Sequence, residues 1–167
     1  MKTQQVIFAA GCFWGVQYYF DQVPGVVKTT VGYTGGHTEY PTYDDVASRM
    51  TGHAEATLVE YDPEKVSYKT LLLQFFRMHD PTTIDRQGPD IGDEYRSAIF
   101  YFDPQQHQQA VEVRNARQKE IDKPIVTEIE PAGPFYPAEE YHQKFTEKTG
   151  IGMCHIPYAP VGVQNTK

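Results

Sequence analysis

Residues 5–20 read QVIFAAGCFWGVQYYF, a short apolar run followed by a glycine turn and a second apolar segment. The run from Gln5 to Ala10 is typical of a buried strand. From Phe13 the apolar residues recur at helical spacing as far as Pro24, and a proline is common just after a helix ends. The stretch therefore predicts a strand, a tight turn and a helix, with Cys12 where the turn meets the helix.

The rest of the chain continues this alternation of strands and helices. The expected elements are strands at 26–33 and 53–61, a helix at 67–78 capped by Ser67, an irregular stretch at 81–92 and a strand at 97–102. With the first unit they form β-α-β-β-α-β, the split-βαβ or ferredoxin-like arrangement. A helix at 104–121, a strand at 125–129 and a helix at 138–148 are appended. We predict an α+β fold with a ferredoxin-like mixed sheet core.

Length and net charge limit the classes of protein to which the chain can belong. A chain of 167 residues can bury a substantial core, so residues 1–167 are expected to form a single domain. Residues 149–167 are rich in glycine and proline and are expected to be a flexible, coil-rich tail. The net charge of -7 with no basic block argues against a nucleic-acid partner. No apolar run approaches the roughly 20 residues of a membrane span.

The two cysteines, Cys12 and Cys154, are too few for a disulfide framework. In a reducing compartment they are expected to be thiols at rest. The apolar stretch before Cys12 is shorter than the roughly 7–15 residues of a signal sequence, so we expect a cytoplasmic protein. From the residues alone, the two thiols are either independent core residues or a transient catalytic or redox pair.

Cys12 stands in Gly11-Cys12-Phe13-Trp14-Gly15, beside the only tryptophan. Flanking glycines cost conformational entropy and pack nothing, so a purely structural cysteine does not need them. Backbone N–H groups and the positive end of a helix favour a thiolate at this point. The alternative is a small buried hydrophobe. The glycines and the strand-to-helix turn favour a reactive thiol beside an aromatic pocket.

Four other residues are candidates for the same site. Glu55, in a predicted strand, is either a solvated carboxylate or, facing the Cys12 pocket, a proton donor. Tyr43 and Tyr95 lie in loop-like settings, and their hydroxyls can polarise a neutral substrate oxygen or simply pack. Asp90 is equally compatible with capping a turn.

Metal and hydrolase chemistry are the rival interpretations. The six histidines are scattered without a ligand-spaced pair, which argues against a metal site. A cysteine hydrolase would pair Cys12 with a histidine, and no local histidine motif supports one. Cys154 belongs to the predicted tail, where it is either a resolving thiol or uninvolved.

Several blocks of the chain resemble the type A family of peptide methionine sulfoxide reductases, in family order over roughly residues 5 to 156. The blocks are Gly11-Cys12-Phe13-Trp14-Gly15, Thr51-Gly52-His53-Ala54-Glu55, His79-Asp80-Pro81-Thr82-Thr83, Arg86-Gln87-Gly88, Tyr95-Arg96-Ser97-Ala98-Ile99 and Ala138-Glu139-Glu140-Tyr141-His142-Gln143. Each short block is weak by itself, but the set in register is specific. The resemblance implies a single catalytic domain that reduces methionine sulfoxide.

The resemblance also implies residue roles. Cys12 is then the nucleophile, and Phe13 with Trp14 holds the methyl group of the sulfoxide. The sulfoxide oxygen is surrounded by Glu55, Tyr43 and Tyr95, and Asp90 supports this arrangement.

Turnover follows from the same resemblance. A sulfenic acid on Cys12 is resolved by Cys154 through a Cys12–Cys154 disulfide. Ala47 stands where many members carry a further cysteine, so Cys154 is the candidate for resolution.

The expected substrates are the S epimer of methionine sulfoxide, in oxidised proteins and as the free amino acid, and the reductant is thioredoxin or dithiothreitol. The resemblance implies no cofactor, no metal and a monomer. Two other hypotheses stay open, a cysteine hydrolase or acyl transferase and a non-enzymatic redox-sensing module.

Overall fold

The computed structural model describes residues 2–151. Cys154 and the predicted tail beyond Ile151 lie outside the described residues. The part of that tail within the described range begins in regular structure, because Thr149 is the last residue of a short helix.

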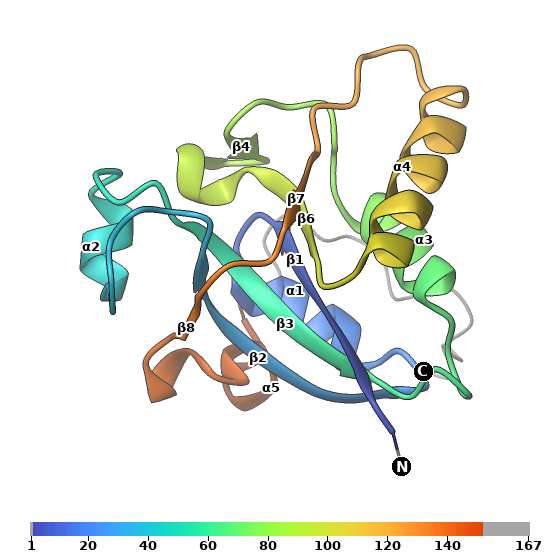
Figure 1. Cartoon of the computed structure of the whole chain (residues 1–167). Coiled ribbons are helices and arrows are strands. Elements are labelled where there is room, and N and C mark those ends of the chain that lie inside the picture. Colours follow the sequence, from blue (N-terminus) through green and yellow to red (C-terminus); the bar gives the residue numbers. More distant parts are fainter. Residues whose placement is uncertain (1, 152–167) are drawn as a thin grey trace.

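One curled sheet of six strands organises the fold (Figure 1). Its strands are β1 (Gln4–Ala10), β2 (Val26–Thr34), β3 (Ala54–Tyr61), β6 (Ser97–Tyr101), β7 (Glu128–Pro131) and β8 (Phe135–Pro137). They lie in the order β7-β6-β1-β3-β2-β8, and only the β6–β7 pair in this sheet is parallel. β3 lies between β1 and β2, as a split βαβ unit requires. The predicted α+β class is confirmed, and β7 and β8 extend the four central strands on either side.

The described chain also contains five α-helices and two short 3₁₀ turns. They are α1 (Phe13–Asp21), α2 (Tyr43–Ala47), α3 (Tyr68–Met78), α4 (Pro104–Gln118), α5 (Phe145–Thr149), η1 (Asp93–Tyr95) and η2 (Glu140–His142). Ser67 caps α3 as predicted, since its hydroxyl accepts from the Thr70 N–H at 3.0 Å. Figure 1 shows α3 and α4 side by side, where the two helices pack against each other.

Both faces of the central strand β1 are buried. Phe8 points to the helical side and stacks between Phe20 of α1 and Phe75 of α3, with ring centroids 5.1 and 4.9 Å apart. Ile7 and Ala9 point to the opposite side, into a second apolar cluster with residues of β3 and β6. Alternation on a pleated strand explains this division. The two-sided burial fixes the position of the turn at Cys12, which follows directly from β1.

The register of β1 against β3 brings a distant residue to that turn. Phe8 lies opposite Thr57, and continuing the antiparallel register places Glu55 opposite the end of β1. On the other side of β3, Glu55 pairs with Tyr33.

Three predicted elements are corrected by the structure. The helix predicted at 138–148 is wrong: this segment forms η2 and the five-residue α5, because Lys144 has a left-handed φ of 59° that a helix cannot contain. The strand predicted at 125–129 lies at Glu128–Pro131 instead, where it pairs with β6. The helix predicted at 104–121 ends at Gln118.

Several short elements were not predicted, among them β8 and η1. The stretch at 81–92, expected to be irregular, contains a hairpin of β4 (Arg86–Gln87) and β5 (Asp90–Ile91). The loop around Tyr43 contains α2, which begins with a capping box between Thr42 and Asp45.

Candidate active site

Cys12 lies at the N-terminal end of α1, in the turn that follows β1. The turn needs Gly11, whose φ of 92° is a left-handed conformation that glycine adopts without a Cβ clash. Cys12 is 8% exposed, and its carbonyl accepts from the Val16 N–H in the first turn of the helix. The positive end of the α1 dipole favours the thiolate form of a sulfur at this position.

A cavity of about 120 Å³ opens beside Cys12. Its lining consists of Cys12, Phe13, Trp14, Tyr43, Glu55, Asp90 and Tyr95. These are the candidate site residues of the sequence analysis that fall within the described part of the chain. They come from the turn before α1 and from α1, α2, β3, β5 and η1. The fold therefore brings together side chains that are dispersed over more than half of the sequence.

Glu55 is held against the start of α1. Its carboxylate Oε1 accepts from the Phe13 N–H at 3.2 Å, and the residue is 3% exposed. The interpretation of Glu55 as a solvated carboxylate is therefore wrong, because β3 has a neighbour on either side in the sheet and residues on each of its faces belong to a buried apolar cluster. A buried carboxyl group beside the Cys12 cavity can serve as a proton donor.

The two cavity tyrosines approach from separate short helices. Tyr43 is the first residue of α2 and Tyr95 the last residue of η1. Burial raises the pKa of the Tyr43 phenol, and the charge of Glu55 raises it further, although a hydrogen bond with Tyr95 acts in the opposite direction. Burial and the Glu55 charge likewise raise the pKa of Tyr95. Both phenols therefore stay protonated and can donate hydrogen bonds to an oxygen atom in the cavity.

Asp90 is the first residue of β5 and lines the cavity. The turn of its hairpin is made by the preceding residues, where Gly88 has a left-handed φ of 56°. Within the described residues, Asp90 Oδ2 is buried and has no hydrogen-bond donor. An acceptor of this kind can receive a hydrogen bond from a group that enters the cavity.

Two residues of the C-terminal segment support the cavity, and the sequence analysis did not single them out. Glu139 accepts from the Tyr33 hydroxyl at 2.8 Å and from the Tyr43 N–H at 2.9 Å. Burial alone would raise the pKa of Glu139, but these donors lower it, so the carboxylate stays charged. His142 Nδ1 accepts from Trp14 Nε1 at 2.9 Å. Both belong to the Ala138–Gln143 block of the family resemblance, and this block is the signal in the sequence that could have identified them.

The described residues contain no group of three or more His, Cys, Asp or Glu side chains arranged to hold a metal ion. Between residues 2 and 151, no helix has both the length and the apolar character needed to cross a membrane.

The sequence matches the family described as "Peptide methionine sulfoxide reductase" over residues 4–167. Among its relatives is the peptide methionine sulfoxide reductase MsrA of Methanothermobacter thermautotrophicus, 51% identical over 157 residues, which cover 93% of each chain.

Solved structures agree with this match. The reduced form of Mxr1 from Saccharomyces cerevisiae is 33% identical, with a TM-score of 0.87 over 96% of this chain and 90% of that one. Mxr1 in complex with Trx2 is 28% identical, with a TM-score of 0.63 over 86% of this chain and 85% of that one. The chain belongs to the peptide methionine sulfoxide reductase family, and the cavity beside Cys12 is its candidate active site.

Proposed function

We propose that the Cys12 cavity reduces methionine-S-sulfoxide, both in oxidised proteins and as the free amino acid. The observation that supports this proposal is the joint lining of one small cavity by a thiol, a buried carboxyl group, two phenols and two aromatic rings. A thiol can attack the sulfur, the acid and phenols can bind the oxygen, and the rings can hold the methyl group. The cavity is compact enough to exclude most water from this chemistry.

In the first step, the Cys12 thiolate attacks the sulfoxide sulfur while Glu55 donates a proton to the sulfoxide oxygen. Tyr43 and Tyr95 donate hydrogen bonds to the same oxygen without losing their own protons. The sulfur–sulfur bond formed by this attack and the S–O bond of the substrate then both break as the protonated oxygen moves to the Cys12 sulfur, which becomes a sulfenic acid. The substrate sulfur is reduced by two electrons and the Cys12 sulfur is oxidised by two, which releases methionine.

In the second step, the Cys154 thiol attacks the sulfenic sulfur of Cys12 and water leaves. The product is a Cys12–Cys154 disulfide, which a dithiol reduces by exchange. We propose thioredoxin as the physiological dithiol, by analogy with the Mxr1 structure in complex with Trx2. Dithiothreitol should replace it in the test tube.

The proposed cycle uses side chains and an external dithiol, so we propose no cofactor or metal. With its two cysteines as the redox pair, the chain fits a reducing compartment, and we propose a cytoplasmic monomer.

Separated epimers of methionine sulfoxide test this function directly. With dithiothreitol as reductant, the S epimer should yield methionine and the R epimer should not. Absence of turnover, or equal turnover of both epimers, would contradict the proposal. The hydrolase hypothesis predicts instead a covalent acyl adduct on Cys12, visible by intact mass. The redox-sensor hypothesis predicts equal oxidation of the cysteines by peroxide and by methionine sulfoxide.

Cys154→Ser should complete a single turnover and then stall when thioredoxin is the reductant. Without the resolving thiol, the sulfenic acid on Cys12 cannot become the disulfide that thioredoxin attacks. The measurement is methionine formed per enzyme, in a rapid-mixing experiment followed to steady state, with the unaltered chain as control. Sustained thioredoxin-driven turnover in this variant would refute the assignment of Cys154.

A further inference from the structure

Arg49, just after α2, has a backbone conformation that an arginine rarely adopts. Its φ of 64° lies in the left-handed region, and its N–H donates to the Val46 carbonyl at 3.0 Å. Glycine usually occupies such a position after a helix, because a Cβ is unfavourable there. A strained residue of this kind persists where other contacts hold it in place, so the contacts of the Arg49 side chain are informative.

The Arg49 side chain reaches from the end of α2 to β5 and η1. Its Nη2 donates to the Ile91 carbonyl in β5, and its Nε lies 3.4 Å from Oε1 of Glu94 in η1. The last residue of η1 is Tyr95, whereas α2 begins with Tyr43. One side chain therefore joins the two segments that bring the cavity tyrosines together.

Glu94 needs this contact because it is buried. Its side chain is 4% exposed, whereas that of Arg49 is 55% exposed. Within the described residues, Glu94 Oε1 accepts no hydrogen bond of ordinary geometry, so the ion pair with Arg49 supplies its compensating charge. Burial raises the pKa of Glu94, while a backbone hydrogen bond and the charge of Arg49 act in the opposite direction. Because a buried carboxylate without a counter-charge is unfavourable, Glu94 holds the guanidinium of Arg49 at η1.

Gly92 makes room for this ion pair. Its φ is 146°, and a Cβ at this position would clash with Nε of Arg49 and Oε1 of Glu94. The Gly92 N–H donates to the Asp85 carbonyl at 2.8 Å, and its own carbonyl accepts from the Tyr95 N–H at 3.0 Å. The ion pair therefore packs directly on the backbone that positions Tyr95.

We propose that Arg49 is a positioning residue: by joining the end of α2 to β5 and η1, it fixes the phenols of Tyr43 and Tyr95 at the spacing that binds the sulfoxide oxygen. The hydrogen bond between the two phenols is in keeping with this spacing. Arg49 is not among the residues that line the cavity, so it acts through the tyrosines. The role of the phenols rests on the proposed function, whereas the link between the two segments rests on the contacts of Arg49.

Arg49→Gly removes the side chain and suits the left-handed backbone, so the end of α2 should be kept. Removal of one donor to a developing oxyanion typically costs roughly 10²–10³ in kcat, and a displaced donor should cost less. We therefore expect kcat for methionine-S-sulfoxide to fall about tenfold, with a smaller change in KM. Arg49→Lys, which keeps a positive charge beside Glu94, should recover part of this loss.

Arg117→Ala is the matched control. Arg117 also forms an ion pair with a glutamate, Glu120, at 3.0 Å near the end of α4, and neither residue lines the cavity. This variant should leave kcat and KM unchanged. An Arg49→Gly enzyme with the kcat of the unaltered chain would overturn the proposal.

A second variant separates the missing link from the unpaired charge that Arg49→Gly leaves on Glu94. Glu94→Gln removes this charge with little change in volume, so the double variant Arg49→Gly/Glu94→Gln should fold without a buried unpaired carboxylate. We expect it to show the same fall in kcat as Arg49→Gly. Recovery of the full rate in the double variant would show that the unpaired charge lowers the rate, and the proposal would fail.

Tyr95→Phe tests whether Arg49 acts through the phenols. If Arg49 positions Tyr95, the fall in kcat caused by Tyr95→Phe should be smaller in the Arg49→Gly background than in the unaltered chain, because a misplaced hydroxyl contributes less. A residue that only stabilises the fold would give equal losses in the two backgrounds. Equal losses would therefore refute a positioning role for Arg49.

Hydrogen exchange gives a readout that needs no substrate. The backbone amides of residues 85–95 should exchange several times faster in Arg49→Gly than in the unaltered chain or in Arg117→Ala, because the link to α2 is lost. Unchanged exchange would overturn the link, whatever the kinetics. If the unaltered protein does not reduce the S epimer, the proposed function fails, and the exchange result still decides whether Arg49 joins the two segments.

Discussion

Cys12→Ser is expected to abolish methionine sulfoxide reduction, lowering the initial rate by more than about a thousandfold. A serine hydroxyl at the start of α1 remains protonated at neutral pH and attacks sulfur poorly, whereas the helix end favours a thiolate at Cys12. Oxygen and sulfur differ little in size, so the turn after Gly11 should be preserved. The measurement is the initial rate with the S epimer and dithiothreitol.

Two controls accompany this variant. Thermal unfolding of Cys12→Ser should resemble that of the unaltered chain, which would exclude loss of the fold as the cause. Cys154→Ser under the same conditions should still form methionine in its first turnover. Measurable steady turnover in Cys12→Ser would show that another group attacks the sulfoxide. If chelators abolished that turnover, the result would favour metal chemistry.

Glu55→Gln is expected to lower kcat by about 10²–10⁴-fold at neutral pH while substrate still binds. Glutamine has nearly the same volume, and its side-chain oxygen can still accept from the Phe13 N–H, which is 3.2 Å from Glu55 Oε1. The change therefore removes the transferable proton and leaves the backbone contact in place. The measurement is kcat and KM for the S epimer.

The matched control is Glu60→Gln, a glutamate on the same strand that is partly exposed and does not line the cavity. It should leave both kinetic constants unchanged. A Glu55→Gln enzyme with the rate of the unaltered chain would exclude Glu55 as the proton donor and leave its contact with Phe13 as its function.

Local sequence patterns were sufficient to predict a helix or strand where it buries one continuous set of apolar residues. The helix over Tyr68–Met78 and its Ser67 cap were predicted, because the cap and the apolar stripe are both local features. The central strands were predicted within a residue or two for the same reason. The unpaired ends of such elements are where prediction is weakest.

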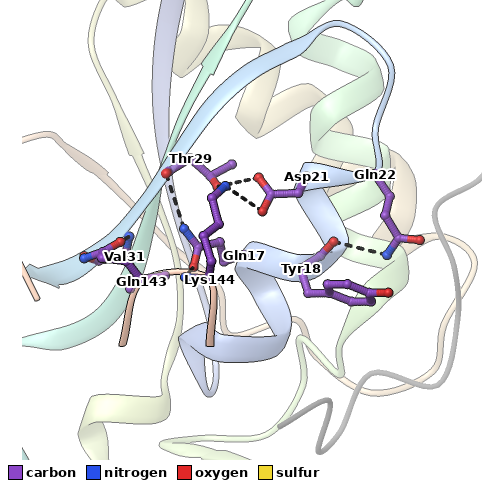
Figure 2. Close-up of polar contacts among 8 residues, drawn as sticks. All are labelled: Gln17, Tyr18, Asp21, Gln22, Thr29, Val31, Gln143 and Lys144. Atoms are coloured by element: carbon purple, nitrogen blue, oxygen red, sulfur yellow. Dashed lines mark hydrogen bonds and ion pairs between the residues drawn. The ribbon is translucent and has the colours of Figure 1, made fainter. Parts of the chain in front are cut away.

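Prediction failed where distant side chains compete with the local backbone pattern. Within Ala138–Lys144, the Gln143 side chain forms hydrogen bonds with both the N–H and the carbonyl of Val31 in β2. Lys144 forms an ion pair with Asp21 (Figure 2). These contacts hold the segment out of the helix that its composition favours. Similarly, the Ile125 N–H donates to Gln118 Oε1 and not to a neighbouring strand, so β7 begins only at Glu128.

The sequence by itself determined the turn that presents Cys12, because Gly11, the preceding strand and the following helix are neighbours in the chain. It also determined the family, because the motifs and their order can be read from the sequence alone. Only the tertiary structure decided that Glu55 is buried at the same cavity, since that depends on the register of β1 against β3. The hydrogen bond from Trp14 to His142 was likewise decided by the tertiary structure. Contacts between residues far apart in sequence arise from packing, and no local sequence pattern predicts them.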